Sequence, residues 1–120
     1  PGIQNGNLLQ MHTFPCENGD EFPKNQYTKW FDYDKIKGTL SLRHRQPGDY
    51  LTLPSGGRKT LKSWMIDEKI PRQEREQIWL LAEEKHILWI VGHRISAYYK
   101  ITEQTKTILE VEFNGGKSSG

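Results

Sequence analysis

The sequence predicts an α+β domain that is mostly β, with two short helices around residues 59–77. Apolar and polar residues alternate over 40–45 and again over 107–113, which is the period of strands with one buried face. The run 86–91 is apolar almost throughout, which indicates a central strand covered on both faces. A segment between these runs carries apolar residues at helical spacing. Together these patterns predict the α+β class.

Seven segments have the composition of strands and are bounded by turns rich in proline, glycine and acidic residues. In chain order they are 8–13, 27–33, 40–45, 50–53, 79–83, 86–91 and 107–113. The first of these is a weak pattern, and residues 94–101 fit either a strand or a helical turn. Alternation in the last segment places Leu109, Val111 and Phe113 in the core.

An apolar stripe with i, i+3, i+4 spacing predicts a helix over 59–70. The stripe consists of Leu61, Trp64 and Met65. Pro71 ends this helix, because proline lacks an N–H and clashes with the preceding turn. Proline also suits the first position of a helix, so a second short helix is predicted over 71–77.

The chain has 120 residues, which fits one domain with a core that needs no disulfide or structural metal. Residues 1–26 are expected to form a linker with the weak strand, 27–113 the domain itself, and 114–120 a disordered tail. No apolar stretch approaches the ~18 residues of a membrane span, and no secretory signal is visible. Cys16 is the one cysteine, so an internal disulfide is excluded. These features predict a cytoplasmic protein without a membrane partner.

Charge is unevenly distributed along the chain. The segment 35–75 holds ten Lys or Arg residues and four acidic ones, a net charge of +6, whereas the rest of the chain carries −4. A domain with one basic segment suggests a surface for a polyanion. The alternative is a charged face that is only solvated by water.

Patterns of catalytic or metal chemistry are absent from the sequence. The four histidines have no metal-ligand spacing with one another or with Cys16. Residues 55–60 resemble a phosphate-binding loop in composition, but they do not match the Walker A template. A turn before a helix fits them better. Asp32 and Asp34 are expected to cap or solvate a turn. With no nucleophile motif either, we expect no catalytic residue, metal or cofactor in this chain.

Basic residues gather from several predicted elements and form the candidate site. Arg43 and Arg45 are expected on one strand face. The first helix is expected to carry Lys59, Lys62 and Lys69, and the second Arg72 and Arg75. Such a set could straddle a phosphate backbone, and without a base-reading signature it suggests recognition of shape, as on A-form RNA.

Two alternatives compete with these readings. Some arginines could pair with acidic neighbours and only hold the fold together; Arg43 and Asp49 flank one turn, so this pair is expected to be partly architectural. The four tryptophans could form a stacking platform for bases, but their positions favour core packing.

Three spaced motifs resemble a known family. Residues 42–49, LRHRQPGD, resemble the LRxRxPGD motif in the C-terminal domain of tRNA(Ile)-lysidine synthase. Residues 59–75 are similar to the family's KxLK and IDxKIPRxxR motifs, and 89–96 to its WxxGxRIS motif. The resemblance covers about residues 27–113 and keeps the family's order of motifs.

This resemblance implies a compact, sandwich-like fold with short helices, related to a module of the phenylalanyl-tRNA synthetase β chain. It implies a parent enzyme that uses ATP to join lysine to C2 of the wobble cytidine of a CAU-anticodon isoleucine tRNA. ATP and magnesium would belong to an N-terminal catalytic domain, whose SGGxDS loop is absent here. This domain is expected to dock the acceptor stem, with the catalytic domain as its other partner and a homodimer left open.

The family's motifs also assign residues. Carried over to this sequence, the positions expected to face RNA are Arg43, Arg45, Lys59, Lys62, Lys69, Arg72, Arg75 and Arg94. The competing hypothesis is a protein–protein or interdomain interaction module that uses the same basic face. An independent small enzyme is disfavoured by the missing nucleophile and metal patterns.

Overall fold

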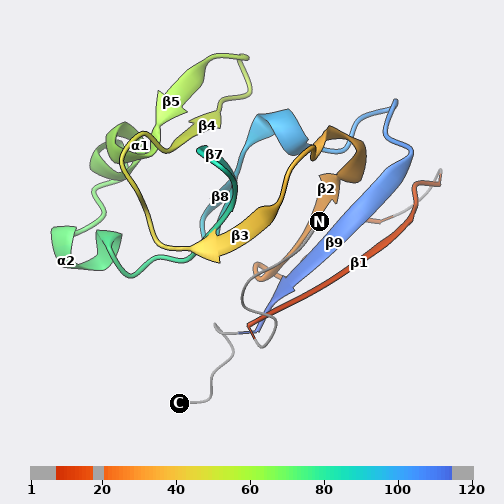
Figure 1. Ribbon diagram of the computed structural model, residues 1–120, viewed down its shortest axis with the longest axis horizontal. Helices are drawn as coiled ribbons and strands as arrows, with labels where there is room; N and C mark the ends of the chain where they lie inside the picture. The colour runs from red at the N-terminus through yellow and green to blue at the C-terminus, as the bar shows by residue number, and fades with distance from the viewer. Residues whose placement is uncertain (1–7, 18–20, 115–120) are drawn as a thin grey trace.

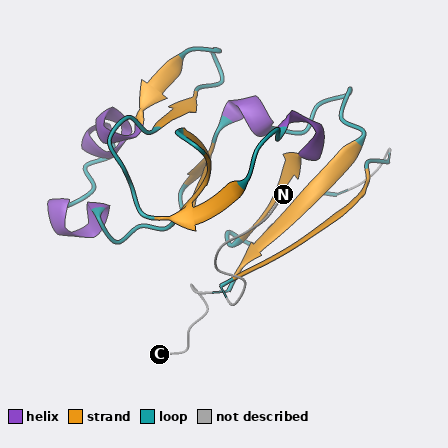
Figure 2. Ribbon diagram, viewed as in Figure 1, coloured by secondary structure: helices purple, strands orange, loops and turns teal. Residues whose placement is uncertain are grey.

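The computed structural model describes residues 8–17 and 21–114 of the chain. Its elements, in chain order, are β1 (Leu9–Pro15), β2 (Thr28–Asp32), η1 (Tyr33–Lys35), β3 (Leu40–Arg43), β4 (Tyr50–Thr52), β5 (Arg58–Thr60), α1 (Leu61–Asp67), α2 (Arg72–Arg75), β6 (Leu80–Glu83), β7 (His86–Ile90), β8 (Arg94–Ile95), η2 (Ala97–Tyr99) and β9 (Thr107–Phe113). Figure 1 shows α1 and α2 at the end of the molecule that lies away from β1, β9 and β2. Strands dominate and the helices are short (Figure 2), which confirms the predicted class.

One sheet has three strands in the order β1–β9–β2. β9 is central and antiparallel to both neighbours, with Leu9 opposite Phe113 at one end of the β1 ladder and Pro15 opposite Thr107 at the other. Leu109, Val111 and Phe113 are buried, which confirms the face predicted from their alternation. The weak N-terminal strand therefore pairs along its whole length with the last strand of the chain.

The other sheet has the order β3–β6–β7–β4–β5, with β8 paired to β7. All four residues 87–90 of β7 are fully buried, because they contribute to two apolar clusters. Leu88 and Trp89 join the cluster shared with β9, whereas Ile87 and Ile90 join the cluster around α1. This confirms the central strand predicted from the apolar run.

Helix α1 begins later than the sequence predicts. Residues 58–60 form β5, which pairs with β4 from Tyr50 opposite Thr60 to Thr52 opposite Arg58. Thr60 then caps α1, since its extended backbone ends the strand and its hydroxyl accepts a hydrogen bond from the Ser63 N–H. The predicted core stripe on the helix is confirmed, because Leu61, Trp64 and Met65 are buried.

These boundaries correct three predicted positions. Lys59 lies on β5 and not on a helix. Lys69 lies beyond the end of α1 with a left-handed φ of 58°, so only Lys62 of the three lysines is helical. Arg45 lies beyond β3, which ends at Arg43, so the two arginines do not share a strand face. The helix starts later than the local pattern indicates in the first case, and the helix or strand ends earlier in the other two.

The remaining elements follow the predictions more closely. Pro71 directly precedes α2, which is shorter than the predicted helix over 71–77. The ambiguous segment 94–101 contains both a two-residue strand, β8, and the helical turn η2. Most of the predicted tail and the first residues of the predicted linker, 115–120 and 1–7, lie outside the described residues. Among the helices that the structure describes, none has the length and apolar run that a bilayer crossing needs.

Candidate nucleic-acid interface

The Arg43 side chain is mostly buried, and its partners lie within the fold. Its guanidinium donates two hydrogen bonds of 2.9 Å to the two carboxylate oxygens of Asp49, which is only 2% exposed. It also donates to the carbonyls of His44, at 2.9 Å, and Glu84, at 2.7 Å. The expectation that this pair is partly architectural is confirmed, because the fork closes the loop between β3 and β4.

The loop 44–49 is fixed against its neighbours. The Gln46 N–H donates to the Asp49 carboxylate at 2.8 Å, and the Leu61 N–H donates to the Asp49 carbonyl at 2.8 Å. The Lys85 ammonium donates to the Pro47 carbonyl at 2.8 Å. Gly48 has a φ of 90°, which only glycine adopts without strain. The motif of residues 42–49 thus builds a rigid loop beside the start of α1.

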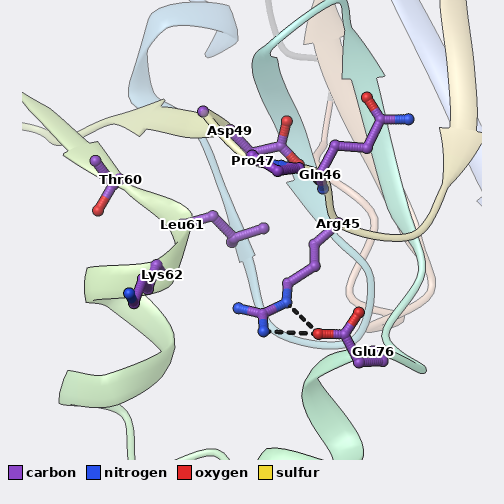
Figure 3. A pocket seen from close by; sticks show the side chains of 9 residues that line it. Arg45, Gln46, Pro47, Asp49, Thr60, Leu61, Lys62 and Glu76 are labelled. Atoms are coloured by element: carbon purple, nitrogen blue, oxygen red, sulfur yellow. Dashed lines mark hydrogen bonds and ion pairs between the residues drawn. The ribbon is translucent and has the colours of Figure 1, made fainter.

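A cavity of about 580 Å³ opens between this loop, α1 and the segment after α2. Figure 3 shows Arg45 meeting Glu76 on one side, Lys62 on α1 on the other, and Leu61 between them. The Arg45 guanidinium donates to a Glu76 carboxylate oxygen at 2.6 Å. Because the Glu76 side chain is largely exposed, this ion pair contributes little to stability and can be exchanged for another anion.

The remaining predicted cations differ in how they are paired. Lys59 forms an ion pair with Asp67 of α1. Arg75 donates to the Ile70 carbonyl at 2.8 Å but has no carboxylate partner among the described residues. The same holds, within that part of the chain, for Lys62, Lys69, Arg72 and Arg94.

The fold brings most of the predicted site residues to one end of the molecule. Lys59, Lys62, Lys69, Arg72 and Arg75 lie in or beside α1 and α2. Arg45 reaches this end through Glu76, which directly follows α2. Arg94 lines a separate hollow with Trp64 and Glu68, beside α1. We call these seven residues the α1–α2 face; Arg43 alone of the predicted set is turned into the fold.

The predicted core role of the tryptophans is confirmed for Trp64 and Trp89, which are buried. Trp30 is half-buried and donates through its indole to Glu110 at 2.9 Å. Asp32 caps η1 by accepting from the Asp34 N–H, as expected for a turn. In the described part of the chain, no three His, Cys, Asp or Glu side chains come together as metal ligands would.

Sequence reasoning missed another polar hollow, which contains His86. The imidazole stacks on Tyr50, with ring centroids 4.6 Å apart, and its Nε2 lies 3.0 Å from the Thr52 hydroxyl and 3.2 Å from the Ser96 hydroxyl. Burial lowers the pKa of His86, and the charge of Arg58 lowers it further. No local spacing signals this site, because its residues come from separate elements.

Glu83 and Tyr99 form the inner wall of this hollow. The Tyr99 hydroxyl donates to Glu83 at 2.7 Å, and the backbone N–H groups of Lys37 and Gly38 donate to the other carboxylate oxygen. Burial alone raises the pKa of Glu83, but these hydrogen bonds outweigh it and the pKa lies below its ordinary value. Burial and Glu83 together raise the pKa of Tyr99. Glu83 is therefore a carboxylate and Tyr99 a neutral phenol at neutral pH.

The free energy of unfolding is expected to fall as the pH drops below 6.5, the ordinary pKa of histidine. The unfolded chain then takes up a proton at His86, which the folded chain resists, so stability is lost until the lower folded pKa is passed. Glu83 adds a second loss below 4.5, because its carboxyl is protonated in the unfolded chain before the folded one. Urea unfolding between about pH 3 and 8 measures both. His86→Gln is expected to remove the loss of stability below pH 6.5, whereas the control His93→Gln is expected to retain it. A chain that gains stability below pH 6.5 would contradict the assignment of this loss to His86.

Comparison with known proteins identifies the family. The model of the TilS substrate C-terminal domain matches residues 40–112. The chain belongs to this family. A tRNA(Ile)-lysidine synthase of Caldanaerobacter subterraneus subsp. tengcongensis is 46% identical over 95 residues, which cover 78% of this chain and 20% of that protein. One from Clostridium tetani is 41% identical over 101 residues, covering 83% of this chain and 22% of that protein.

A solved structure supports the same assignment. A crystal structure of a TilS C-terminal domain superposes with a TM-score of 0.63 at 27% identity, over 89% of this chain and 85% of that one. A match over 89% of the chain extends beyond 40–112, so it takes in part of the β1–β9–β2 sheet. The resemblance to the TilS C-terminal domain is thereby confirmed. The chain spans about a fifth of the length of the curated relatives it matches.

Proposed function

We propose that this TilS C-terminal domain docks the acceptor stem of the CAU-anticodon isoleucine tRNA for a lysidine synthase. A separate catalytic domain, with ATP and magnesium, would join lysine to the wobble cytidine in the cytoplasm. The observation that carries this proposal is the α1–α2 face of a member of this family, where five of the seven cations have no carboxylate partner among the described residues.

Docking requires phosphate contacts of fixed geometry. Lys62, Lys69 and Arg72 are exposed and have no carboxylate partner among the described residues, so a phosphate need not displace one. Arg45 can exchange Glu76 for a phosphate oxygen, because exposed ion pairs are weak. Arg43 holds the loop that carries Arg45, and so acts as a positioning residue. Such contacts recognise shape and backbone, which suits an A-form stem.

Binding to tRNA is expected to depend strongly on salt. Four to six neutralised phosphates would weaken binding by roughly two to three orders of magnitude over a fourfold rise in salt. The test titrates the chain with the CAU-anticodon isoleucine tRNA, an acceptor-stem minihelix and an anticodon-stem hairpin at two salt concentrations. Salt-sensitive binding to tRNA and minihelix, with weaker binding to the hairpin, supports acceptor-stem docking.

The interaction-module alternative gives the opposite pattern. If the α1–α2 face contacts a protein domain or a second copy, RNA binding is absent at low salt. The mass of the chain in solution, measured by light scattering, then increases with concentration or on adding the catalytic domain.

A further inference from the structure

The hollow around His86 has a volume of about 640 Å³, lies next to the cavity beside α1 and combines aromatic rings with cations. Its aromatic residues are Tyr50, His86, Tyr98 and Tyr99, and its cations are Lys35, Lys37, Arg58 and Lys85. The two hollows meet at the loop 46–49: Lys85 lines this one and donates to the carbonyl of Pro47, which lines the other. A strand that leaves the α1–α2 face over this loop would therefore enter the hollow. We call it the tyrosine hollow.

The rings form a stack that ends in solvent. The Tyr50 ring lies 4.6 Å from His86 at an interplanar angle of 28°, and the Arg58 guanidinium lies 4.3 Å from the centroid of Tyr50. Arg58 is exposed. Tyr98, with its ring centroid 5.1 Å from that of His86, is 43% exposed. The hollow thus presents two planar groups, a guanidinium and a phenol ring, on which a base can stack.

Partly buried hydrogen bonds fix the stack. Hydroxyl groups of Thr52 and Ser96 hold the His86 Nε2. Tyr99, which packs edge-on against Tyr98 with centroids 4.9 Å apart, is anchored by its hydroxyl to Glu83. Because these partners are already in place, a ligand would not need to order the rings.

The charge of the hollow favours an anion. None of its four cations lies within ion-pair distance of a carboxylate among the described residues. Lys35 lies over the Tyr98 ring, with its Nζ 5.1 Å from the centroid. The hollow is lined by two carboxylates, Glu83 and Glu84, so its four cations outnumber them. Glu83 is occupied by Tyr99 and two backbone N–H groups. Cations that have no carboxylate partner and lie beside stacking surfaces are the chemistry that binds a single-stranded nucleotide.

We propose that the tyrosine hollow binds an unpaired nucleotide of an RNA strand that continues from a duplex on the α1–α2 face. The base stacks on Arg58 or Tyr98, and its phosphates contact lysines at the rim. This inference rests on the proposed function, in that the duplex and the unpaired nucleotide belong to one RNA. The single-stranded 3′ end of an acceptor stem has this arrangement.

The test compares a blunt acceptor-stem duplex with the same duplex carrying a four-nucleotide 3′ extension. The extension is expected to increase affinity roughly five- to a hundredfold, the range for one stacked base. Tyr98→Ala and Arg58→Ala lose most of this gain and bind the blunt duplex as the unmodified chain does. Arg58→Lys keeps the positive charge but removes the planar guanidinium, so it also loses the affinity gained from the extension if stacking is responsible.

Phe22→Ala is the matched control, since Phe22 is also an exposed aromatic residue (59%) but lines a different hollow. It retains the full gain. In the unmodified chain, the imidazole NMR signals of His86 shift with the extended duplex and not with the blunt one. Thermal melts show that the variants fold.

Other outcomes overturn the inference. An extension that adds no affinity, or variants that weaken both duplexes equally, excludes an unpaired-nucleotide site. Binding of adenosine monophosphate that depends on Tyr98, without any gain from the extension, assigns the hollow to a free nucleotide instead. If the blunt duplex does not bind but a short single strand binds and loses affinity on Tyr98→Ala, the proposed docking function fails while the hollow's assignment stands.

Discussion

Replacing Arg72 and Arg75 together by glutamate is expected to lower the affinity for the isoleucine tRNA by roughly a hundredfold or more. Each arginine loses a charge-assisted hydrogen bond to phosphate, which contributes about 1.5–3 kcal/mol, and each glutamate adds repulsion. Both residues belong to α2, which buries none of its residues, so the fold should persist. Binding is measured by titration at low salt, with a thermal melt of each variant.

A second double variant controls for net charge. Lys100→Glu and Lys106→Glu reverse the same number of charges on exposed residues near the three-stranded sheet, away from α1 and α2. This control is expected to weaken binding far less and to keep the salt dependence. The α2 variant is expected to reduce the slope of log binding constant against log salt concentration by about two. Equal losses in the two variants would mean that only net charge matters. Unchanged RNA binding with an altered oligomeric mass would favour the interaction module.

Asp49→Ala is expected to lower the free energy of unfolding by about 3–5 kcal/mol. The substitution removes the carboxylate that accepts two hydrogen bonds from Arg43 and one from the Gln46 N–H. It leaves the Arg43 guanidinium largely buried without its counter-charge, which costs more than the pair itself contributes. Urea unfolding measures the loss.

Asp67→Ala is the matched comparison, because it breaks the ion pair with Lys59 at a side chain that is mostly exposed. Its expected loss is about 0–1 kcal/mol. The difference between the two losses distinguishes an ion pair that holds the loop 44–49 from an exposed ion pair that adds little stability. A loss below 1 kcal/mol for Asp49→Ala would show that the loop does not depend on this carboxylate.

Local patterns were sufficient for the strands with buried faces. Alternation identified β3 and β9, and a continuous apolar run identified β7, because burial on one or both faces leaves a periodic record in the sequence. Strand β5 shows no such pattern of apolar residues. It consists of three polar residues, and its pairing with β4 comes from the hairpin rather than from its own composition.

The grouping of most candidate cations was predictable from the sequence, but most of their ion pairs and the elements that carry three of them were not. Arg43 and Asp49 flank one turn, so their ion pair was visible in the sequence. Arg45 and Glu76 are 31 residues apart, and only the fold brings them together. The tyrosine hollow was not predictable at all: Tyr50 and His86 become neighbours through the parallel pairing of β4 with β7, and long-range parallel pairing has no local signature.

The central claim is that RNA binds at the α1–α2 face, and backbone amide NMR of the 120-residue chain tests it most directly. The chain is titrated with an acceptor-stem minihelix at low salt and the shifted signals are mapped onto the fold. We predict that the signals of residues 59–75 and of Arg94 shift, while those of β1 and β2 stay in place. Shifts confined to the β1–β9–β2 sheet, or no shift at all at low salt, would contradict the claim.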